Sequence, residues 1–173
     1  MAALIVDGRR VPDGWTWLRE PVEDPTALPA GDRIVPLASW LAHGERLRAL
    51  RGRTGVWLAV DEEPEALAGA LGGLALVALH FPAAADGRPL SSAVLLRTRL
   101  GWTGELRALG DVRRDQLVYL HRCGFDSYLL PPDEDPRGAL DTLSVLHAGP
   151  GRHYQPDVRS REAALATRSR QAV

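Results

Sequence analysis

The sequence predicts an α/β protein whose core is a parallel β-sheet built from repeated strand–helix units. Four consecutive segments between residues 56 and 147 each read as a strand followed by a helix, the alternation that parallel sheets show. The run at 74–81 is almost entirely apolar, as expected of a strand that is covered on both faces. A chain of 173 residues with 45% hydrophobic residues can also bury a core without disulfides.

The first residues are expected to form a β-hairpin followed by one more strand. An apolar strand at 3–6 leads into Asp7-Gly8, a pair that favours a two-residue turn, and 9–11 returns alongside it. The alternation in 15–17, where two tryptophans flank a threonine, is typical of a further strand. Proline and acidic residues then crowd residues 20–32, which predicts a loop or linker.

The rest of the chain is expected to alternate strands and helices. The predicted pairs are a strand at 33–37 with a helix at 38–50, 56–61 with 63–71, 74–81 with 91–101, 105–109 with 112–123, and 127–131 with 135–147. We therefore expect a hairpin and linker at 1–32, an α/β domain at 33–150, and a polar, flexible tail at 151–173.

Local patterns predict how two of these helices begin or end. Ser91 or Ser92 should cap the helix at 91–101, and Asp111 should cap the helix at 112–123, because serine and aspartate accept hydrogen bonds from free helical N–H groups. Gly124-Phe125 follows the second helix in the order of a left-handed cap, whose apolar residue folds back on the last turn.

The strand at 105–109 bears on which kind of parallel sheet is formed. Glu105, Arg107 and Leu109 point to one face, and Leu106 and Ala108 point to the other. A strand of a flat doubly wound sheet should be apolar on both faces, whereas a strand of a barrel can direct one face toward a polar interior. We therefore expect a half-barrel or TIM-barrel-like sheet, completed by a partner or by the N-terminal strands. A flavodoxin-like sheet is the alternative, because the same units build both.

Charge and composition argue against several classes of function. The formal net charge is −1, so no overall attraction to nucleic acid or to a membrane is expected. The sequence has no apolar run long enough to cross a membrane and no signal-peptide pattern, and its single cysteine, Cys123, cannot form an internal disulfide. A cytoplasmic location is therefore expected. All 21 basic residues are arginines, planar cations suited to carboxylates and oxyanions.

Polar residues gather where parallel sheets bind ligands, beyond the carboxyl ends of the strands. The long connection 82–90 leads from one strand end into a helix, and a helix N-terminus beside arginines favours bound oxyanions. We expect Arg88, Arg97 and Arg107 to meet there. The full set of residues predicted to form a small-anion site is Arg88, Ser91, Arg97, Arg107, Asp111, Asp115 and Gln116.

No motif in the sequence identifies a reaction. It lacks a GxGxxG after a strand, a GxxxxGK[ST] loop, a CxxC pair, an HExxH helix and a GxSxG elbow. Asp61, His80 and Asp111 are residue types that bind metals, but their spacing does not single out a metal site. No catalytic residue, metal or cofactor is predicted, and whether the chain is an enzyme stays open.

The stretch from Phe81 to Leu130 resembles a bacterial protein family, the domain of unknown function 934. The family pattern is F-x-D-G-R-G-Y-S, then LLRxRxG, GELRAxGDV, DQ and GFD. The matching residues here are Phe81, Asp86–Arg88, Ser91, Leu95–Arg97, Arg99, Gly101, Gly104–Arg107, Gly110-Asp111, Asp115-Gln116 and Gly124–Asp126. Pro89-Leu90 departs from the usual Gly-Tyr, and "HYQP" at 153–156 resembles a late Tyr-Gln pair of the family.

The resemblance implies a pathway rather than a mechanism. Members of this family are usually encoded beside the sulfite reductase haemoprotein and are loosely described as oxidoreductases. An accessory protein of assimilatory sulfite reduction, acting with sulfite reductase or its electron donor, is therefore expected. Two other interpretations stay open: a small-anion-binding protein or enzyme, and a homodimer in which the polar motifs build the fold.

Overall fold

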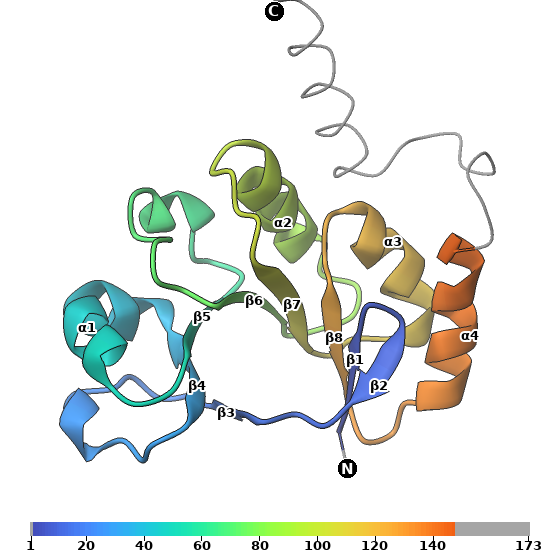
Figure 1. Cartoon of the computed structure of the whole chain (residues 1–173). Helices are drawn as coiled ribbons and strands as arrows, with labels where there is room; N and C mark the ends of the chain where they lie inside the picture. The colour runs from blue at the N-terminus through green and yellow to red at the C-terminus, as the bar shows by residue number, and fades with distance from the viewer. Residues whose placement is uncertain (1, 148–173) are drawn as a thin grey trace, which may run out of the picture.

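The computed structural model describes residues 2–147, which form one eight-stranded sheet with helices packed against one of its faces (Figure 1). The tail expected at 151–173 lies outside these residues. The strands are β1 (Ala3–Val6), β2 (Arg9–Val11), β3 (Trp15–Trp17), β4 (Asp32–Pro36), β5 (Thr54–Leu58), β6 (Leu76–Phe81), β7 (Glu105–Gly110) and β8 (Ser127–Leu130). The helices are α1 (Leu37–Ala49), α2 (Arg88–Thr98), α3 (Leu117–Arg122) and α4 (Pro136–His147).

The strand order confirms a half-barrel. It runs β2-β1-β8-β7-β6-β5-β4-β3, so β3 to β8 follow one another across the sheet in chain order. Each neighbouring pair from β3 to β8 is parallel, while β1 pairs antiparallel with both β2 and β8. Figure 1 shows these strands following an arc, with the four helices along its outside. A flavodoxin-like sheet is excluded because the strand order there reverses at a switch point.

The short connection between β2 and β3 explains why the sheet curls. These two strands form the opposite edges of the sheet, yet only residues 12–14 join them. Eight strands laid flat would separate the edges by about 34 Å at the usual spacing of neighbouring strands. The four chain steps from Val11 to Trp15 span at most about 14 Å. The sheet must therefore bend until its edges approach each other.

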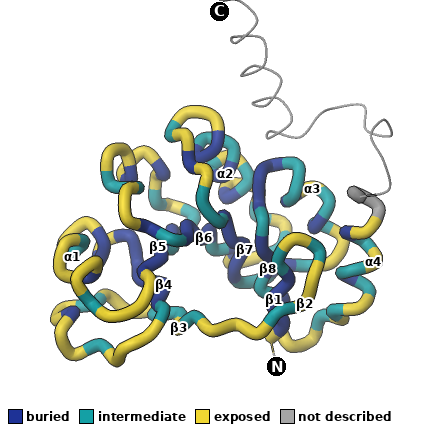
Figure 2. Tube along the Cα trace, viewed as in Figure 1, coloured by how far each residue is buried: buried dark blue, intermediate teal, exposed yellow. Residues whose placement is uncertain are grey.

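The two faces of the sheet have different environments. The outer face packs against the helices in one large core, to which Val35, Val56 and Val77 contribute from successive strands. The inner face holds a smaller apolar cluster with no helical member, made by Ile34, Leu76, Ala78 and Leu109 with Trp15, Trp17, Trp57 and Leu129 packed against it. Figure 2 shows that the buried residues concentrate in the strands, whereas the β2–β3 connection is mostly exposed.

Three helices differ from the sequence-based expectation. The predicted helix at 63–71 is wrong: only a 3-10 turn, Pro64–Leu67, forms there, and Gly69 then adopts a left-handed φ of +78° that stops it. α2 begins three residues before Ser91 because Pro89 suits a first helical turn, so neither serine is its cap. The helix expected from 112 begins at Leu117, after a 3-10 turn at Arg114–Gln116.

The end of α3 confirms the expected glycine cap. Gly124 has a left-handed φ of +103° and donates its N–H to the carbonyl of His121 at 2.9 Å. Phe125 donates back to the carbonyl of Leu120 at 3.2 Å and is fully buried. Across residues 2–147, no helix combines the length and the apolar character that crossing a bilayer requires.

Gly110 is the glycine on which the end of β7 depends. Its φ is +95°, and a Cβ atom placed there would lie 2.2 Å from the carbonyl oxygen of Phe81 on β6. Gly110→Ala should therefore lower the free energy of unfolding by about 2–3 kcal/mol, through left-handed strain and a backbone clash. Urea denaturation followed by circular dichroism measures this loss.

Gly72→Ala is the matched control, because no heavy atom lies within 4 Å of its added Cβ and its φ is not left-handed. The control should unfold at nearly the wild-type urea concentration. Equal midpoints for the Gly110 and Gly72 variants would contradict the role given to Gly110.

Candidate functional site

The C-terminal rim of the sheet, formed by the loops after β6, β7 and β8, is held together by polar side chains of the β7–α3 loop. The Asp111 carboxylate accepts the N–H of Ala84 at 2.9 Å, and the Gln116 amide donates to the carbonyl of the same residue. Both side chains thus bind the β6–α2 loop. The expectation that Asp111 caps a helix is wrong, because Arg113, not Asp111, directly precedes the first helical turn.

Arg113 extends this network to the third loop. Its Nε donates to Asp111 at 2.6 Å and its Nη1 to Asp133 at 2.7 Å, with Glu134 at 3.5 Å. Hydrogen bonds to Asp133 and Asp111 raise the pKa of Arg113, and the hydrogen bond from Arg113 lowers the pKa of Asp133. The charges of the rim therefore stabilise one another in their ionised forms.

Three other predicted site residues lie in exposed positions near the rim. Arg88, whose side chain is 63% exposed, forms an ion pair with Asp86 at 2.6 Å. The hydrogen bonds from the Arg88 side chain and N–H lower the pKa of Asp86. Ser91 and Asp115 are also exposed. This part of the rim is solvated, and the charge of Arg88 is balanced by Asp86.

Arg97, in contrast, is buried near the C-terminal end of α2 and binds several groups around it. Its guanidinium donates to the carbonyls of Gly124 at 3.0 Å, Trp102 at 2.6 Å and Gly104 at 2.9 Å. It also forms an ion pair with Asp126 at 2.5 Å. Gly104 and Asp126 directly precede β7 and β8, so Arg97 joins α2 to the N-terminal ends of these strands.

Arg107 lies on the inner face, as the alternation of its strand predicts. Its side chain is only 1% exposed and forms ion pairs with Glu105 at 2.8 Å and Asp13 at 3.2 Å. Ser127 on β8 donates its hydroxyl to Glu105 at 2.6 Å. The polar interior expected of a half-barrel is therefore present, and carboxylates neutralise its cation.

The structure does not bring the predicted arginines together. Arg88 is at the start of α2, Arg97 is near its end, and Arg107 points into the half-barrel. Asp111 and Gln116 do meet, at Ala84, where they hold the β6–α2 loop, and the arginine that Asp111 binds is Arg113 rather than one of the predicted three. Anion binding by these residues stays a prediction.

A second group of residues on the inner face has the character of a ligand site, and the sequence pattern did not single it out. The rings of Trp17, Trp57 and His80 contact one another, with centroids 5.6–6.0 Å apart. The guanidinium of Arg19 lies over the Trp17 ring at 4.4 Å. His80 lies near the C-terminal end of β6. Barrels bind their ligands at this end of their strands.

The hydrogen-bonding capacity of this cluster, which we call the inner aromatic cluster (Trp17, Arg19, Trp57 and His80), is only partly used. The indole N–H of Trp57 donates to the carbonyl of Leu18 at 2.8 Å, whereas that of Trp17 is buried with no partner among the described residues. Burial, and then the charge of Arg19, lower the pKa of His80. A neutral His80 offers one donor and one acceptor.

Within residues 2–147, no three histidine, cysteine, aspartate or glutamate side chains are grouped so that they could hold a metal ion. Cys123 is buried, and burial raises the pKa of its thiol. A raised pKa disfavours the reactive thiolate at neutral pH.

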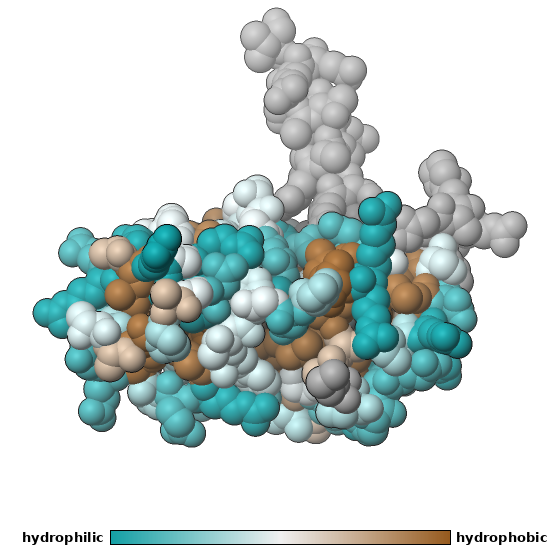
Figure 3. Space-filling view, turned by 60° about the horizontal axis from the view of Figure 1, so that its bottom comes forward, coloured by the Kyte–Doolittle hydropathy of each residue, from teal (hydrophilic) through white to brown (hydrophobic). Residues whose placement is uncertain are grey.

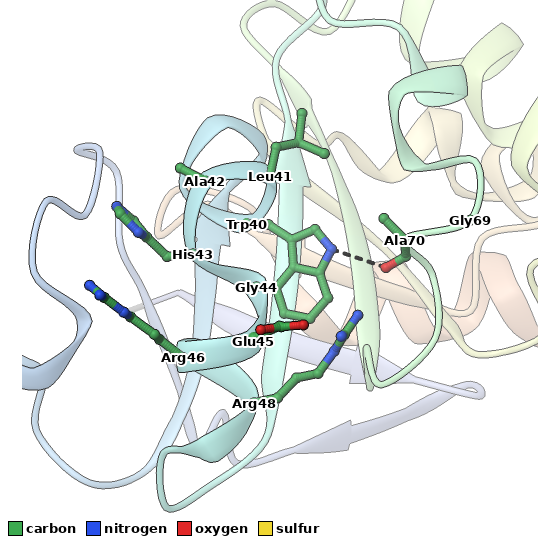
Figure 4. Close-up of a pocket in the computed structure, with 10 residues that line it drawn as sticks. All are labelled: Trp40, Leu41, Ala42, His43, Gly44, Glu45, Arg46, Arg48, Gly69 and Ala70. Atoms are coloured by element: carbon green, nitrogen blue, oxygen red, sulfur yellow. Dashed lines mark hydrogen bonds between the residues drawn. The ribbon is translucent and has the colours of Figure 1, made fainter.

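A hollow of ≈ 690 Å³ lies beside α1, and its lining includes the polar side chains of His43, Glu45, Arg46 and Arg48 (Figure 4). Trp40 donates its indole N–H to the carbonyl of Ala70 at 3.0 Å, and Arg48 covers its ring at 4.8 Å. In Figure 4, His43 and Arg46 point away from this ring. His43 and Arg46 therefore do not converge with Arg48 on the Trp40 ring.

Because Arg97 is buried, we expect it to contribute to the stability of the fold rather than to an anion site. Arg97→Ala should lower the free energy of unfolding by about 3–5 kcal/mol, because it leaves a partly buried carboxylate without its cation. Arg88→Ala, the control from the same predicted site, should leave the urea midpoint nearly unchanged because its ion pair is exposed. A stable Arg97→Ala protein would show that Arg97 is not structural.

A comparison with protein families identifies the chain. The profile of a family of bacterial proteins of unknown function, DUF934, matches residues 55–165, more than half of the sequence. A search of curated proteins found no match. The family match covers the strands from β6 to β8 and the rim loops that Asp111, Arg113 and Gln116 hold together. The chain belongs to the DUF934 family of bacterial proteins.

Proposed function

We propose that this protein is an accessory protein of assimilatory sulfite reduction, which docks on sulfite reductase or on the protein that supplies its electrons. The pathway comes from what the family resemblance of residues 81–130 implies about neighbouring genes. The mode of action comes from the C-terminal rim. The observation that carries it is that this rim presents a surface of paired charges on loops that are tied to one another.

The geometry of the rim suits a protein partner. Asp111 and Gln116 hold the β6–α2 loop, and Arg113 holds the β8–α4 loop, so all three loops are fixed before any partner arrives. Arg88, Asp115 and Asp133 are among the exposed charges of this surface. Charges of both signs on a preformed surface steer association and fix its orientation more than they add affinity.

The properties of the single thiol also support a docking role rather than a redox role for this chain. Cys123 is buried with a raised pKa, which does not favour an exposed redox thiol. In this proposal the partner carries out the electron transfer, and the present chain contributes binding and positioning.

Co-purification tests the docking role. A tagged protein expressed in its native host should recover a component of sulfite reductase at low salt, and Arg88→Glu should reduce the recovered amount by about tenfold because it reverses an exposed rim charge. Arg46→Glu on α1 is the matched control, since Arg46 is also exposed but belongs to a different surface.

Two outcomes would count against docking at the rim. If the wild-type protein recovers no sulfite reductase component at low salt, sulfite reductase is not its partner. Alternatively, Arg88→Glu and Arg46→Glu could reduce recovery equally, which places the contact elsewhere or makes it non-specific.

Small-anion binding is a second candidate, favoured by the inner aromatic cluster rather than by the arginines first expected to form the site. Arg88, Arg97 and Arg107 all have carboxylate partners. Arg19, in contrast, forms no ion pair with a described carboxylate and lies beside the unpartnered N–H of Trp17. Because Arg19 is exposed, it can lift from the Trp17 ring and close on a carboxylate, sulfite, sulfate or phosphate group.

A thermal-shift panel of sulfite, sulfate, phosphate and acetate at constant ionic strength tests this candidate. An anion at 100 times its Kd should stabilise the wild type by about 2.7 kcal/mol, and Arg19→Gln should abolish the response. Arg53→Gln is the control, because Arg53 also stacks on an inner-face tryptophan, Trp15, but is paired with Asp32. A flat wild-type response across the panel would remove the candidate.

A further inference from the structure

The rings of the inner aromatic cluster gather at one end of the half-barrel. Trp17 is the last residue of β3, and Trp57 and His80 are the next-to-last residues of β5 and β6. These strands run parallel within one sheet, so the rings lie toward the end at which barrels bind their ligands. Arg19 follows Trp17 by two residues, and its guanidinium lies over the Trp17 ring at 4.4 Å.

The Trp17 ring is held in one orientation by its neighbours. The Trp57 ring meets it edge-on, at 87° with a centroid distance of 6.0 Å, and the His80 ring contacts it at 51° and 5.6 Å. The indole N–H of Trp57 donates to the carbonyl of Leu18 at 2.8 Å, which ties the backbone between Trp17 and Arg19 to β5. A movement of the Arg19 side chain alone therefore uncovers the ring face beneath it.

Arg19 covers the Trp17 ring on its solvent side and is accessible to a ligand. Arg19 is exposed and Trp17 is half-buried, so the guanidinium lies between the ring and water. No carboxylate of residues 2–147 forms an ion pair with Arg19, which leaves its charge available for an anion. Because planar guanidinium groups bind carboxylates through two parallel hydrogen bonds, Arg19 suits a carboxylate ligand.

The movement of Arg19 has two consequences, and these decide the class of ligand. It frees the guanidinium for an anion, and it exposes an indole face to water, which is unfavourable. An inorganic oxyanion compensates only the first change, because it has no apolar surface with which to cover Trp17. A carboxylate joined to a flat ring compensates both, because its ring stacks on the indole in place of the guanidinium.

We propose that the ligand of the inner aromatic cluster is an aromatic carboxylate, with its carboxylate bound to Arg19 and its ring stacked on Trp17. The proposal rests on the small-anion candidate above and narrows it to one class of organic anion. It does not use the indole N–H of Trp17, which is buried from solvent. The half-buried His80 ring forms no hydrogen bond to a described residue, and it can therefore bind a polar substituent of the ligand ring.

Benzoate is the probe, and NMR titration of the full-length protein measures its Kd. Benzoate should bind about tenfold more tightly than acetate, which has no ring, and about threefold more tightly than cyclohexanecarboxylate, which has no flat face to stack. Intermolecular nuclear Overhauser effects should connect the benzoate ring protons with the Trp17 indole. Equal Kd values for benzoate and cyclohexanecarboxylate, or Overhauser effects to a different tryptophan, would overturn the proposal.

Two variants separate the ring contact from the charge. Trp17→Leu should weaken benzoate binding about tenfold and leave acetate binding unchanged, whereas Arg19→Gln should abolish the binding of both. Trp15→Leu is the matched control and should bind benzoate as the wild type does, because the arginine stacked on Trp15, Arg53, is paired with Asp32. If Trp17→Leu fails to fold, the Overhauser effects in the wild type decide.

The proposal and the small-anion candidate fail in different ways. If Arg19-dependent binding of acetate or an inorganic anion is found, but benzoate binds no more tightly than acetate, the ligand class is wrong and the anion site stands. If benzoate binds equally to the wild type and to Arg19→Gln, or if no anion binds at all, both are wrong.

Discussion

The burial of Arg107 is the constraint around which the half-barrel is arranged. A guanidinium that is 1% exposed must be neutralised, and Glu105 on its own strand supplies only part of the compensation. The second carboxylate, Asp13, comes from the connection that joins the two edges of the sheet. The same ion pair thus neutralises the interior and holds the β2–β3 connection across the open side. Figure 3, which turns this side toward the viewer, shows apolar groups set among polar ones.

Much of the fold could be predicted because its signals are local. The Asp7-Gly8 turn, the apolar run of β6 and the Gly124-Phe125 cap each depend on neighbouring residues, and the polar face of 105–109 favoured a barrel. The predictions of secondary structure and helix caps that were wrong concern places where a local pattern competes with another local preference or with a tertiary contact. The glycines after Leu67 stop a helix that the apolar pattern predicted, and Asp111 binds Ala84 across the rim instead of capping a helix.

The candidate site was harder to predict because its groups come from distant parts of the chain. Charge and spacing drew attention to Arg88, Arg97 and Arg107, but whether an arginine is free depends on carboxylates such as Asp126 and Asp13, which the sequence does not pair with it. Trp17, Trp57 and His80 belong to three strands, and Trp17 on β3 is separated from the other two in the sheet by β4. The strand-end position of His80 was the one local sign of this cluster.

The pairing of β1 with β8 has a consequence for how the protein is made. Of the eight strands of the sheet, β1 is synthesised first and its partner β8 is synthesised last. The consecutive parallel strands β3 to β7 can associate while the chain grows, whereas the N-terminal hairpin has to wait with one edge of its apolar strand β1 unpaired. The step that completes the sheet is therefore the pairing of its first strand with its last, after translation has passed residue 130.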